Sequence, residues 1–369
     1  MKIAIACDFL LEKGGIERIV LTLLETFPEA EIFVVAWDEN LFPQLKNRKV
    51  HSYIKPNSFF SRLVKKRKYF FLPLLPFIIE KFNFSDFDLV ISVGPYTKGI
   101  IVKPQTIHIN YCSTPIHYLW SYKQERLDEG LKFVSKLLPL KLFINFLRTW
   151  DFYVAQRPDF IIANSHFTQK KIQKYYKRES VVIYPPVNTA FFSPKILKKE
   201  GSYYLAVGRL VDYKRWELVI EAFLNLPYNL KICGKGPLLK KLKKKAEGAK
   251  NIDFLGDVSD ETLRELYDNC QALIAPTEED FGIAVVEAMS MGKPVIVYKG
   301  GGFLETVKEG ITGKFFKEQK AVAIQDAILK TKIEKFNPET IRRHALNFSE
   351  SRFKTQIKDF IQKIILEYI

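Results

Sequence analysis

The 369-residue sequence has few cysteines, few histidines and no long uninterrupted apolar segment. Its four cysteines, Cys7, Cys112, Cys233 and Cys270, are far apart and form neither a C-x-x-C pair nor a metal-ligand spacing with histidine. The pattern therefore indicates neither a disulfide framework nor a zinc site and favours a reducing compartment. The longest apolar run, residues 70–79, is about half of a membrane span and contains two prolines, so it does not predict a transmembrane helix.

The first eight residues place one lysine within a short apolar stretch, so we interpret them as a buried strand and not as a secretory signal. This interpretation predicts a cytoplasmic protein. Because 47% of the residues are hydrophobic, the chain can form two domains that each bury a core. The formal net charge of +16 favours anionic partners, and basic residues gather at 62–68.

Apolar, β-branched runs alternate with helix-like segments, which is typical of parallel sheets with crossover helices. The expected strands of the first series are Ile32–Ala36, Leu89–Val93, Ile107–Tyr111, Phe160–Ala163 and Val181–Tyr184. Those of the second series are Tyr203–Val207, Leu230–Cys233, Ile252–Leu255, Ala272–Ala275 and Val295–Tyr298. A proline pair followed by a lysine-rich stretch, residues 185–199, predicts a linker. The α/β pattern thus predicts two doubly wound domains, residues 1–190 and 200–345.

Two cations follow the strand Tyr203–Val207. Arg209 and Lys214 lie five residues apart, just past the carboxyl end of that strand, where open α/β sheets bind ligands. A diphosphate leaving group needs its developing charge neutralised, and an arginine fork with a lysine can do this without a metal. Taken alone, such a pair is more often ordinary surface charge.

A pair of glutamates follows the strand Ala272–Ala275. If a helix begins near Gly282, Glu279 lies in the preceding loop and Glu287 lies more than a turn inside the helix. One carboxylate can then accept hydrogen bonds from sugar hydroxyls while the other accepts them from a ribose diol. The coincidence of this spacing with Arg209, Lys214 and the glycines at 300–302 indicates a nucleotide-sugar site.

These motifs together resemble those of glycosyltransferase family 4, from about Lys2 to Leu346. The family's R-x4-K corresponds to Arg209 and Lys214, its E-x7-E corresponds to Glu279 and Glu287, and its glycine turn corresponds to Gly14 and Gly15. The resemblance implies a GT-B fold, in which two facing Rossmann-like domains enclose a cleft and a carboxyl-terminal helix, here 350–369, returns to the first domain. It also implies a retaining, metal-independent hexosyltransferase that uses a nucleotide-sugar donor as its co-substrate.

The resemblance also implies roles for single residues. Arg209 and Lys214 would hold the diphosphate, Glu279 would orient the transferred sugar, and Glu287 would bind the ribose. The backbone around Phe281 and Gly282 would add contacts to the sugar, and Val258 would meet the base through its main chain. Gly14 and Gly15, whose amides are unhindered by side chains, would approach the donor phosphates at a helix start.

The block from Tyr111 to Trp120 is similar to a block of the family's mannosyltransferase-like members and favours mannose on GDP. It departs from the usual His-Thr-Pro-x-Arg-Tyr-x-Trp at two positions. Ser113 occupies the place of the family's histidine, and His117 occupies that of a common arginine. Ser113 and His117 are therefore candidate sugar or acceptor contacts, although a lone histidine is more often structural.

Two other acidic motifs suggest different chemistry but have simpler explanations. Asp86 and Asp88 resemble the metal-binding D-x-D of another glycosyltransferase fold, but they directly precede a predicted strand. Asp280-Phe281-Gly282 resembles a kinase triplet, yet no kinase lysine strand or catalytic loop accompanies it. We expect no bound metal.

The segment 59–72 interleaves bases with aromatic residues. It could stack nucleobases, lie in an anionic bilayer interface, or be a solvated helix over a core. With a sugar-transfer site already argued, we prefer contact of the Arg62–Lys68 region with the inner face of a membrane, and no nucleic-acid partner. The predicted function is transfer of a hexose to a glycan or lipid-linked acceptor in cell-surface polysaccharide synthesis. The alternative is a noncatalytic, membrane-associated subunit that binds nucleotide sugars.

Overall fold

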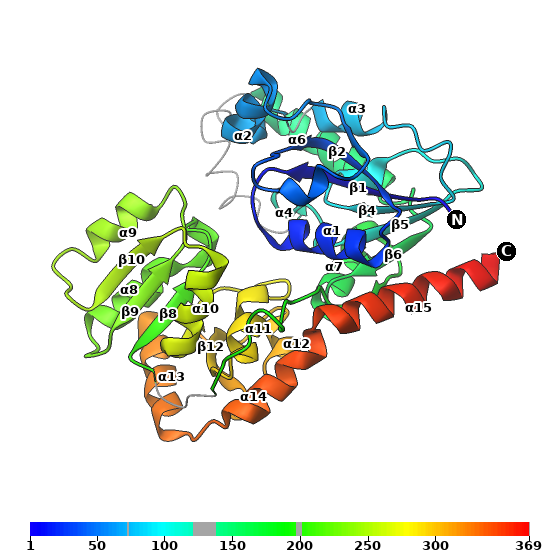
Figure 1. Ribbon diagram of the computed structural model, residues 1–369. Coiled ribbons are helices and arrows are strands. Elements are labelled where there is room, and N and C mark those ends of the chain that lie inside the picture. Colours follow the sequence, from blue (N-terminus) through cyan, green and yellow to red (C-terminus); the bar gives the residue numbers. More distant parts are fainter. Residues whose placement is uncertain (72–73, 121–137, 197–200, 369) are drawn as a thin grey trace. The chain divides into compact units, whose positions relative to one another are not determined.

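The computed structural model describes residues 1–71, 74–120, 138–196 and 201–368, which divide into two compact units (Figure 1). Unit 1 comprises Met1–Pro186 together with the segment from Phe353 onward, and unit 2 comprises Val187–Arg352. Part of the linker predicted at 185–199, residues 197–199, lies outside the described residues.

Unit 1 is built on a seven-stranded parallel sheet with the strand order β3-β2-β1-β4-β5-β6-β7. The strands are β1 (Ile3–Leu10), β2 (Glu31–Trp37), β3 (Val50–Ser52), β4 (Leu89–Val93), β5 (Ile107–Cys112), β6 (Phe160–Ala163) and β7 (Val181–Val182). The order reverses between β1 and β4, so the carboxyl ends of these two strands form the topological switch point where such sheets bind ligands.

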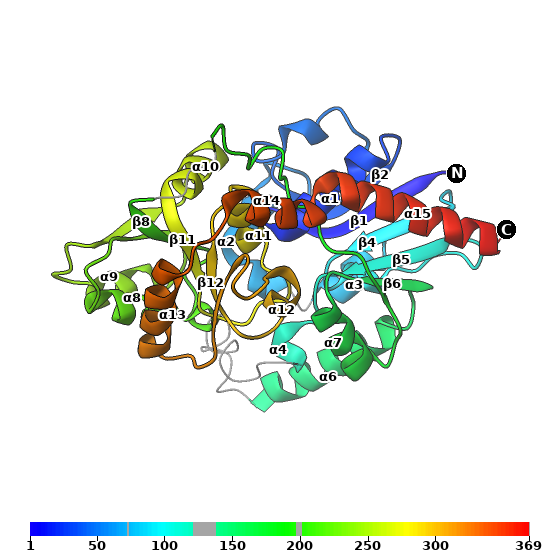
Figure 2. The ribbon, with the colours of Figure 1, turned by 90° about the horizontal axis from the view of Figure 1, so that it is seen from below.

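Alternate residues of β1 face opposite layers of helices. Ile5 and Cys7 belong to a core that includes helix α1 (Gly15–Thr26) and helix α15 (Glu350–Tyr368). Ala4 and Ala6 belong to a second core on the other face, with helix α3 (Leu75–Ile79) and helix α6 (Leu138–Val154). Figure 2 shows α15 beside α1. The predicted return of the carboxyl-terminal helix to the first domain is confirmed by the burial of Phe353 and three isoleucines of α15 in the first core.

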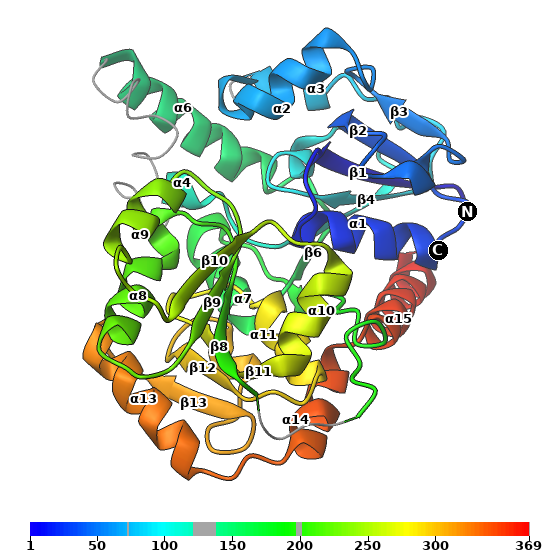
Figure 3. The ribbon, with the colours of Figure 1, turned by 60° about the vertical axis from the view of Figure 1, so that its left-hand side comes forward.

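Unit 2 is built on a six-stranded parallel sheet with the order β10-β9-β8-β11-β12-β13. Its strands are β8 (Tyr203–Val207), β9 (Leu230–Cys233), β10 (Ile252–Gly256), β11 (Cys270–Ala275), β12 (Val295–Tyr298) and β13 (Gly313–Phe316). Helices α8 (Trp216–Leu224), α9 (Leu239–Lys245) and α13 (Ala321–Ile333) pack on one face, as Figure 3 shows. The other face carries α10 (Asp260–Asn269) and α11 (Ile283–Ser290), and α14 (Pro338–Ala345) packs on α11. The switch point lies between β8 and β11.

The predicted α/β class with two Rossmann-like domains is confirmed. Strands β4, β6, β8, β9 and β12 have the predicted bounds. The two edge strands β3 and β13 were not predicted, because each is only three or four residues long and lacks an apolar, β-branched run. Within the described part of the chain, no helix has both the length and the apolar character needed to cross a bilayer.

Candidate active site

The carboxyl edge of the unit 2 sheet gathers most of the predicted donor-binding residues. Gly208 and Arg209 follow β8 directly, and Glu279 follows β11, so the two motifs lie on the two sides of the switch point. Gly208 after β8 and Gly234 after β9 have φ values of +151° and +139°. Gly234 has no room for a side chain, because a Cβ there would lie 1.9 Å from the Gly208 carbonyl oxygen. Glycines thus allow the loops after β8 and β9 to touch.

Lys214 and Glu279 are in direct contact. The Lys214 ammonium donates to the Glu279 carboxylate, and their side chains are only 18% and 22% exposed. Burial alone would lower the pKa of Lys214. The charges of Glu279 and Tyr213, together with the hydrogen bond that Lys214 donates to Glu279, raise this pKa above its usual value. Lys214 is therefore a fixed positive charge at neutral pH.

Arg209 lies on the same loop as Lys214 and is exposed. Its guanidinium donates to the Tyr213 hydroxyl at 3.3 Å, and its carbonyl oxygen accepts from the buried indole of Trp216 at 2.8 Å. The Thr277 hydroxyl donates to the Tyr213 carbonyl oxygen at 2.5 Å, which ties this loop to the one after β11. The predicted cations therefore project from a loop held at three points.

The glycine-rich loop 300–302 packs against the backbone of the glutamate loop. The Gly302 amide donates to the Glu279 carbonyl oxygen at 2.8 Å. A Cβ on Gly301 would lie 2.3 Å from that same oxygen, and one on Gly302 would lie 2.3 Å from the Asp280 oxygen. The glycines thus have a packing role, because they let the loop after β12 contact the backbone of Glu279 directly.

Helix α11 begins after Gly282, so the condition on which the placement of the two glutamates depended is met. Gly282 is the N-cap residue with φ +90°, and Phe281 before it is buried, with its ring 5.6 Å from that of Phe348. Phe281 and Gly282 can therefore offer a ligand only backbone groups. Glu287 lies one turn into the helix, is 3% exposed, and its Oε2 accepts from the Tyr267 hydroxyl at 2.9 Å. The structure thus brings Glu279 to Lys214 but places Glu287 in a separate, buried contact.

Val258 lies after β10, in the turn before α10, and is half-buried. The turn is fixed by the N-cap Ser259, whose hydroxyl accepts from the Thr262 amide at 3.2 Å. Lys235, after β9, pairs with the neighbouring Asp257 at 2.6 Å. Val258 therefore shares the carboxyl edge with Arg209, two strands away from β8.

In unit 1, the loop after β1 carries Gly14 and Gly15. Gly14 is the N-cap of α1, in extended backbone, and Gly15 is the first residue of the helix. A Cβ on Gly14 would lie 2.8 Å from a carboxylate oxygen of Glu17, so this acid folds back toward the helix start. An anionic ligand there would meet the negative charge of Glu17 as well as the helix amides.

Ser113 and His117 lie in the segment that follows β5. His117 opens the short helix α4 (His117–Trp120), and the Ser113 carbonyl oxygen accepts from the Thr168 hydroxyl at 3.4 Å. The Ser113 hydroxyl oxygen is buried and has no hydrogen-bond partner within the described parts of the chain. A buried hydroxyl without a partner is costly, so a ligand group is a natural candidate to satisfy it.

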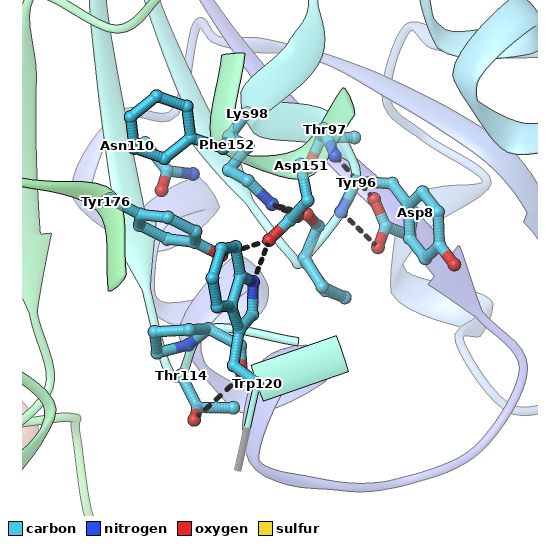
Figure 4. A network of polar contacts seen from close by, with 12 residues as sticks. Asp8, Tyr96, Thr97, Lys98, Asn110, Thr114, Trp120, Asp151, Phe152 and Tyr176 are labelled. Atoms are coloured by element: carbon cyan, nitrogen blue, oxygen red, sulfur yellow. Dashed lines mark hydrogen bonds and ion pairs between the residues drawn. The ribbon is translucent and has the colours of Figure 1, made fainter. Parts of the chain in front are cut away.

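Asp151 of α6 organises the region behind this segment (Figure 4). Its fully buried carboxylate pairs with Lys98 at 2.5 Å and accepts from Trp120 Nε1 at 2.7 Å and the Tyr176 hydroxyl at 2.8 Å. These partners come from different elements, so one carboxylate fixes the end of α4 to the rest of the unit. Asp151 could not be predicted as a buried residue, because nothing in its sequence surroundings distinguishes it from an exposed helix acid.

Asp8 lies near the carboxyl end of β1, at the switch point of unit 1. Its carboxylate accepts from the amides of Tyr96 at 3.1 Å and Thr97 at 2.8 Å, as Figure 4 shows. Burial raises the pKa of Asp8 to about 6, although these amides and the charge of Lys98 favour the ionised form. A polar residue in an otherwise apolar first strand was the signal that could have identified it.

Asp88, one of the two acids set aside as a D-x-D pair, accepts from the Lys2 amide at 2.6 Å and joins two strand starts. Across the described residues, no group of three or more histidine, cysteine, aspartate or glutamate side chains is arranged to hold a metal ion.

Two family models match the chain, one on each half. Residues 13–191 match the model described as "Glycosyltransferase Family 4", and residues 187–346 match the one described as "Glycosyl transferases group 1". Together they extend from residue 13 to residue 346 and include every residue that the family motifs predicted for the site. The chain belongs to glycosyltransferase family 4.

Curated relatives match over part of their length. A glycosyltransferase of Methanocaldococcus jannaschii, MJ1178, is 30% identical over 52% of this chain and 53% of its own length. The human alpha-1,3/1,6-mannosyltransferase ALG2 is 26% identical over 58% of this chain and 61% of its own length. The matches thus span less than two thirds of each of these relatives.

Solved structures share the fold over nearly the whole chain. Anabaena Alr3699/HepE, solved with UDP and glucose, has a TM-score of 0.73 at 18% identity and covers 98% of this chain and 99% of its own. The sucrose-phosphate synthase of Thermosynechococcus elongatus has a TM-score of 0.72 at 17% identity, over 99% and 100% of the two chains. At these identities the likeness establishes the GT-B fold and nothing finer.

Proposed function

We propose that the protein is a retaining, metal-independent hexosyltransferase that moves a sugar from a nucleotide diphosphate to a glycan or lipid-linked acceptor. The observation that carries the proposal is the Lys214–Glu279 contact beside Arg209 at the switch point of unit 2. Two fixed cations and a carboxylate, at the edge where open sheets bind ligands, suit a negatively charged donor with a polar sugar. Unit 2, which contains the predicted domain 200–345, is then the donor-binding domain, and unit 1 is the acceptor-side domain.

The cations act on the leaving group. As the bond to the anomeric carbon breaks, charge develops on the diphosphate, and Arg209 and Lys214 stabilise that charge more than they stabilise the ground state. The raised pKa of Lys214 supports this role, because the ammonium stays protonated throughout the neutral range. Tyr213 keeps the loop in place. Its hydroxyl accepts a hydrogen bond from Arg209, and its carbonyl oxygen accepts one from Thr277.

The carboxylates and backbone groups act on the sugar and the nucleoside. Glu279 accepts sugar hydroxyls while Lys214 fixes its orientation, and the amides at Phe281 and Gly282 add donors. Glu287 binds the ribose diol through a carboxylate whose rotation is restrained by Tyr267. Val258 meets the base through its main chain.

Residues of unit 1 complete the reaction in this proposal. Gly14 and Gly15 offer helix-start amides to the donor phosphate. Ser113, with its unsatisfied hydroxyl, and His117 contact the sugar or the acceptor. The bond between the anomeric carbon and the diphosphate breaks through an oxocarbenium-like state, and the acceptor hydroxyl forms the new glycosidic bond on the face that the diphosphate leaves. The hydroxyl proton passes to the departing diphosphate, so no protein nucleophile is required and the configuration is retained.

The donor we favour is GDP-mannose. The Tyr111–Trp120 block supports mannose, and so does the similarity to ALG2, which is named as a mannosyltransferase. The structure of Alr3699/HepE with UDP and glucose supports UDP-glucose as the donor to test beside it.

A cytoplasmic location at the inner face of a membrane, in cell-surface polysaccharide synthesis, is the setting that we propose. Helix α2 (Phe59–Phe71) exposes Arg62 and carries Lys65, which pairs with Asp38 at 2.5 Å. The side chains of the remaining basic residues, Lys66, Arg67 and Lys68, lie outside those that the structure describes. Bases beside exposed rings suit anionic headgroups.

A noncatalytic nucleotide-sugar-binding subunit is the second candidate, and the serine at position 113 favours it. One experiment separates the two. The purified protein in EDTA is mixed with UDP-, GDP-, ADP- and TDP-sugars, and thermal stabilisation and donor hydrolysis are measured beside Glu279→Ala. Hydrolysis of one donor by the wild type, lost in the variant, supports the transferase. Stabilisation without hydrolysis, even with acceptors added, supports the subunit, and no response to any donor contradicts both.

A further inference from the structure

An apolar groove opens in unit 1, between the segment after β3 and helices α2 and α3. Its volume is about 610 Å³, within the range of small-molecule sites. Aromatic and aliphatic side chains form most of its lining, including Tyr53, Phe60, Leu74 and Phe77, and Lys55 and Lys81 also line it. None of these residues belongs to the donor site described above.

The apolar lining is unusually exposed for a folded protein. Phe60 and Phe77 are each 60% exposed and Leu74 is 50% exposed. Single exposed apolar residues are ordinary, but a contiguous group around a cavity marks a binding surface, since water in contact with that area is released when a ligand covers it. The groove therefore favours a hydrocarbon ligand.

The two lysines add a charge requirement. Lys81 Nζ lies 3.4 Å from the Tyr53 hydroxyl, and neither Lys81 nor Lys55 contacts a carboxylate among the residues described. The adjacent acid, Glu80, is already paired with Arg157 at 2.7 Å. An apolar groove with two ammonium groups that lack carboxylate partners is complementary to an amphiphile with an anionic head.

The place of the groove in the sheet connects it with transfer. Tyr53 and Ile54 follow β3 and remain anchored to β2, because their amides donate to the carbonyl oxygens of Val34 and Val35 at 3.2 and 2.9 Å. The groove therefore opens at the carboxyl edge of the unit 1 sheet. Strand β3 is two strands from β1, roughly 10 Å, and the loop after β1 carries Gly14.

We propose that this groove binds the hydrocarbon chain of a lipid-phosphate acceptor, with Lys55 and Lys81 at the phosphate. This proposal rests on the proposed transfer to a lipid-linked acceptor and specifies that the acceptor is a lipid with a phosphate group. Because the hydrocarbon chain of the lipid enters a cavity, single lipid molecules in solution bind the protein without a bilayer.

Phe59 provides a matched control. It is 75% exposed and its ring contacts that of Phe60 edge to face at 5.9 Å, yet it does not line the groove. If this surface simply dipped into a bilayer, binding would depend on Phe59 of α2 at least as much as on Phe77 of α3. A groove for one chain depends on Phe77 and not on Phe59.

The test measures equilibrium binding of farnesyl phosphate, below its aggregation concentration, to the wild type, Phe77→Ser, Phe59→Ser and Lys81→Gln. We expect Phe77→Ser to weaken binding about tenfold or more, and Phe59→Ser to change it less than about twofold. Lys81→Gln should weaken binding of farnesyl phosphate but not of farnesol. All three side chains are exposed, so the fold should tolerate the changes.

Equal losses in Phe77→Ser and Phe59→Ser, or binding only to phosphatidylglycerol vesicles, would overturn the groove and favour bilayer docking. Binding of inorganic phosphate as tight as that of farnesyl phosphate would also overturn it. Donor consumption by the same preparations tests the transferase activity independently of lipid binding in the groove. A wild type that binds farnesyl phosphate as expected but consumes no donor, even with acceptors added, supports the groove and contradicts the transferase.

Discussion

The indole of Trp120 donates a hydrogen bond to the same Asp151 oxygen that accepts from Tyr176, at 2.7 and 2.8 Å. The other carboxylate oxygen pairs with Lys98, and both charged side chains are almost fully buried. Trp120 ends the segment that begins at Ser113. The position of that segment in unit 1 therefore depends on one buried ion pair.

Loss of Asp151 should destabilise unit 1 strongly. Asp151→Leu leaves the buried Lys98 ammonium unpaired and removes two further acceptor contacts, at a cost of about 3–5 kcal/mol. Asp151→Asn keeps an acceptor oxygen for Trp120 and should cost less. Denaturant unfolding followed by circular dichroism measures both. If the double variant Lys98→Met/Asp151→Leu is no more stable than Asp151→Leu, the unpaired charge is not the cause.

Lys214→Ala should abolish most transfer while the fold survives. Removing one preorganised charge at a leaving group lowers the rate by about 10²–10³-fold, and the side chain is part of no core. Initial rates with the preferred donor test this, with Lys245→Ala as the control, since Lys245 forms only a surface pair with Glu221. Transfer by Lys214→Ala at the rate of the control would refute the proposed role.

Gly282→Ala should lower the unfolding free energy more than the same substitution at Gly310. Gly282 has φ +90°, and a Cβ would lie 2.3 Å from a ring carbon of Phe303. Gly310 has φ +73° with nothing near its missing Cβ, so Gly310→Ala pays only the backbone cost of about 1–2 kcal/mol. We expect Gly282→Ala to exceed that loss in denaturant unfolding and to raise the KM for the donor. Equal losses of stability in the two variants would show that the Phe303 ring moves away from the added Cβ at no cost.

The sequence predicted most strands of the two sheets, because apolar, β-branched runs are local signals, and the family resemblance predicted the carboxyl-terminal helix. It could not show that Lys214 contacts Glu279, since these residues are 65 positions apart and only the sheet order brings their loops together. The burial of Glu287 against Tyr267 was likewise invisible. The same spacing fits an exposed acid, and Tyr267 comes from another helix.

The pH dependence of stability should contain two opposing contributions in unit 1. Burial raises the pKa of Asp8 from 3.8 to about 6, so its stabilising protonated form is lost as pH rises through that interval, a change of roughly 3 kcal/mol. Burial lowers the pKa of His108 from 6.5 to about 3, so its contribution is lost as pH falls below 6.5. In Asp8→Asn the first contribution is absent, and the unfolding free energy of this variant should rise more steeply from pH 4 to 6 than that of the wild type. Parallel profiles would contradict the raised pKa of Asp8.

Ser113→Ala separates a ligand contact from a structural one. The buried hydroxyl makes no hydrogen bond within the described chain, so its removal takes away an unsatisfied polar group and should leave the unfolding free energy unchanged or slightly higher. Ser165→Ala is the control, because Ser165 caps helix α7 (His166–Tyr176) by accepting from the Thr168 amide at 3.0 Å, and its loss should cost about 1 kcal/mol. If Ser113 contacts the sugar or the acceptor, its alanine variant transfers several-fold more slowly at full stability, while Ser165→Ala is less stable but transfers normally. The reverse pattern would make Ser113 a bystander and remove it from the site.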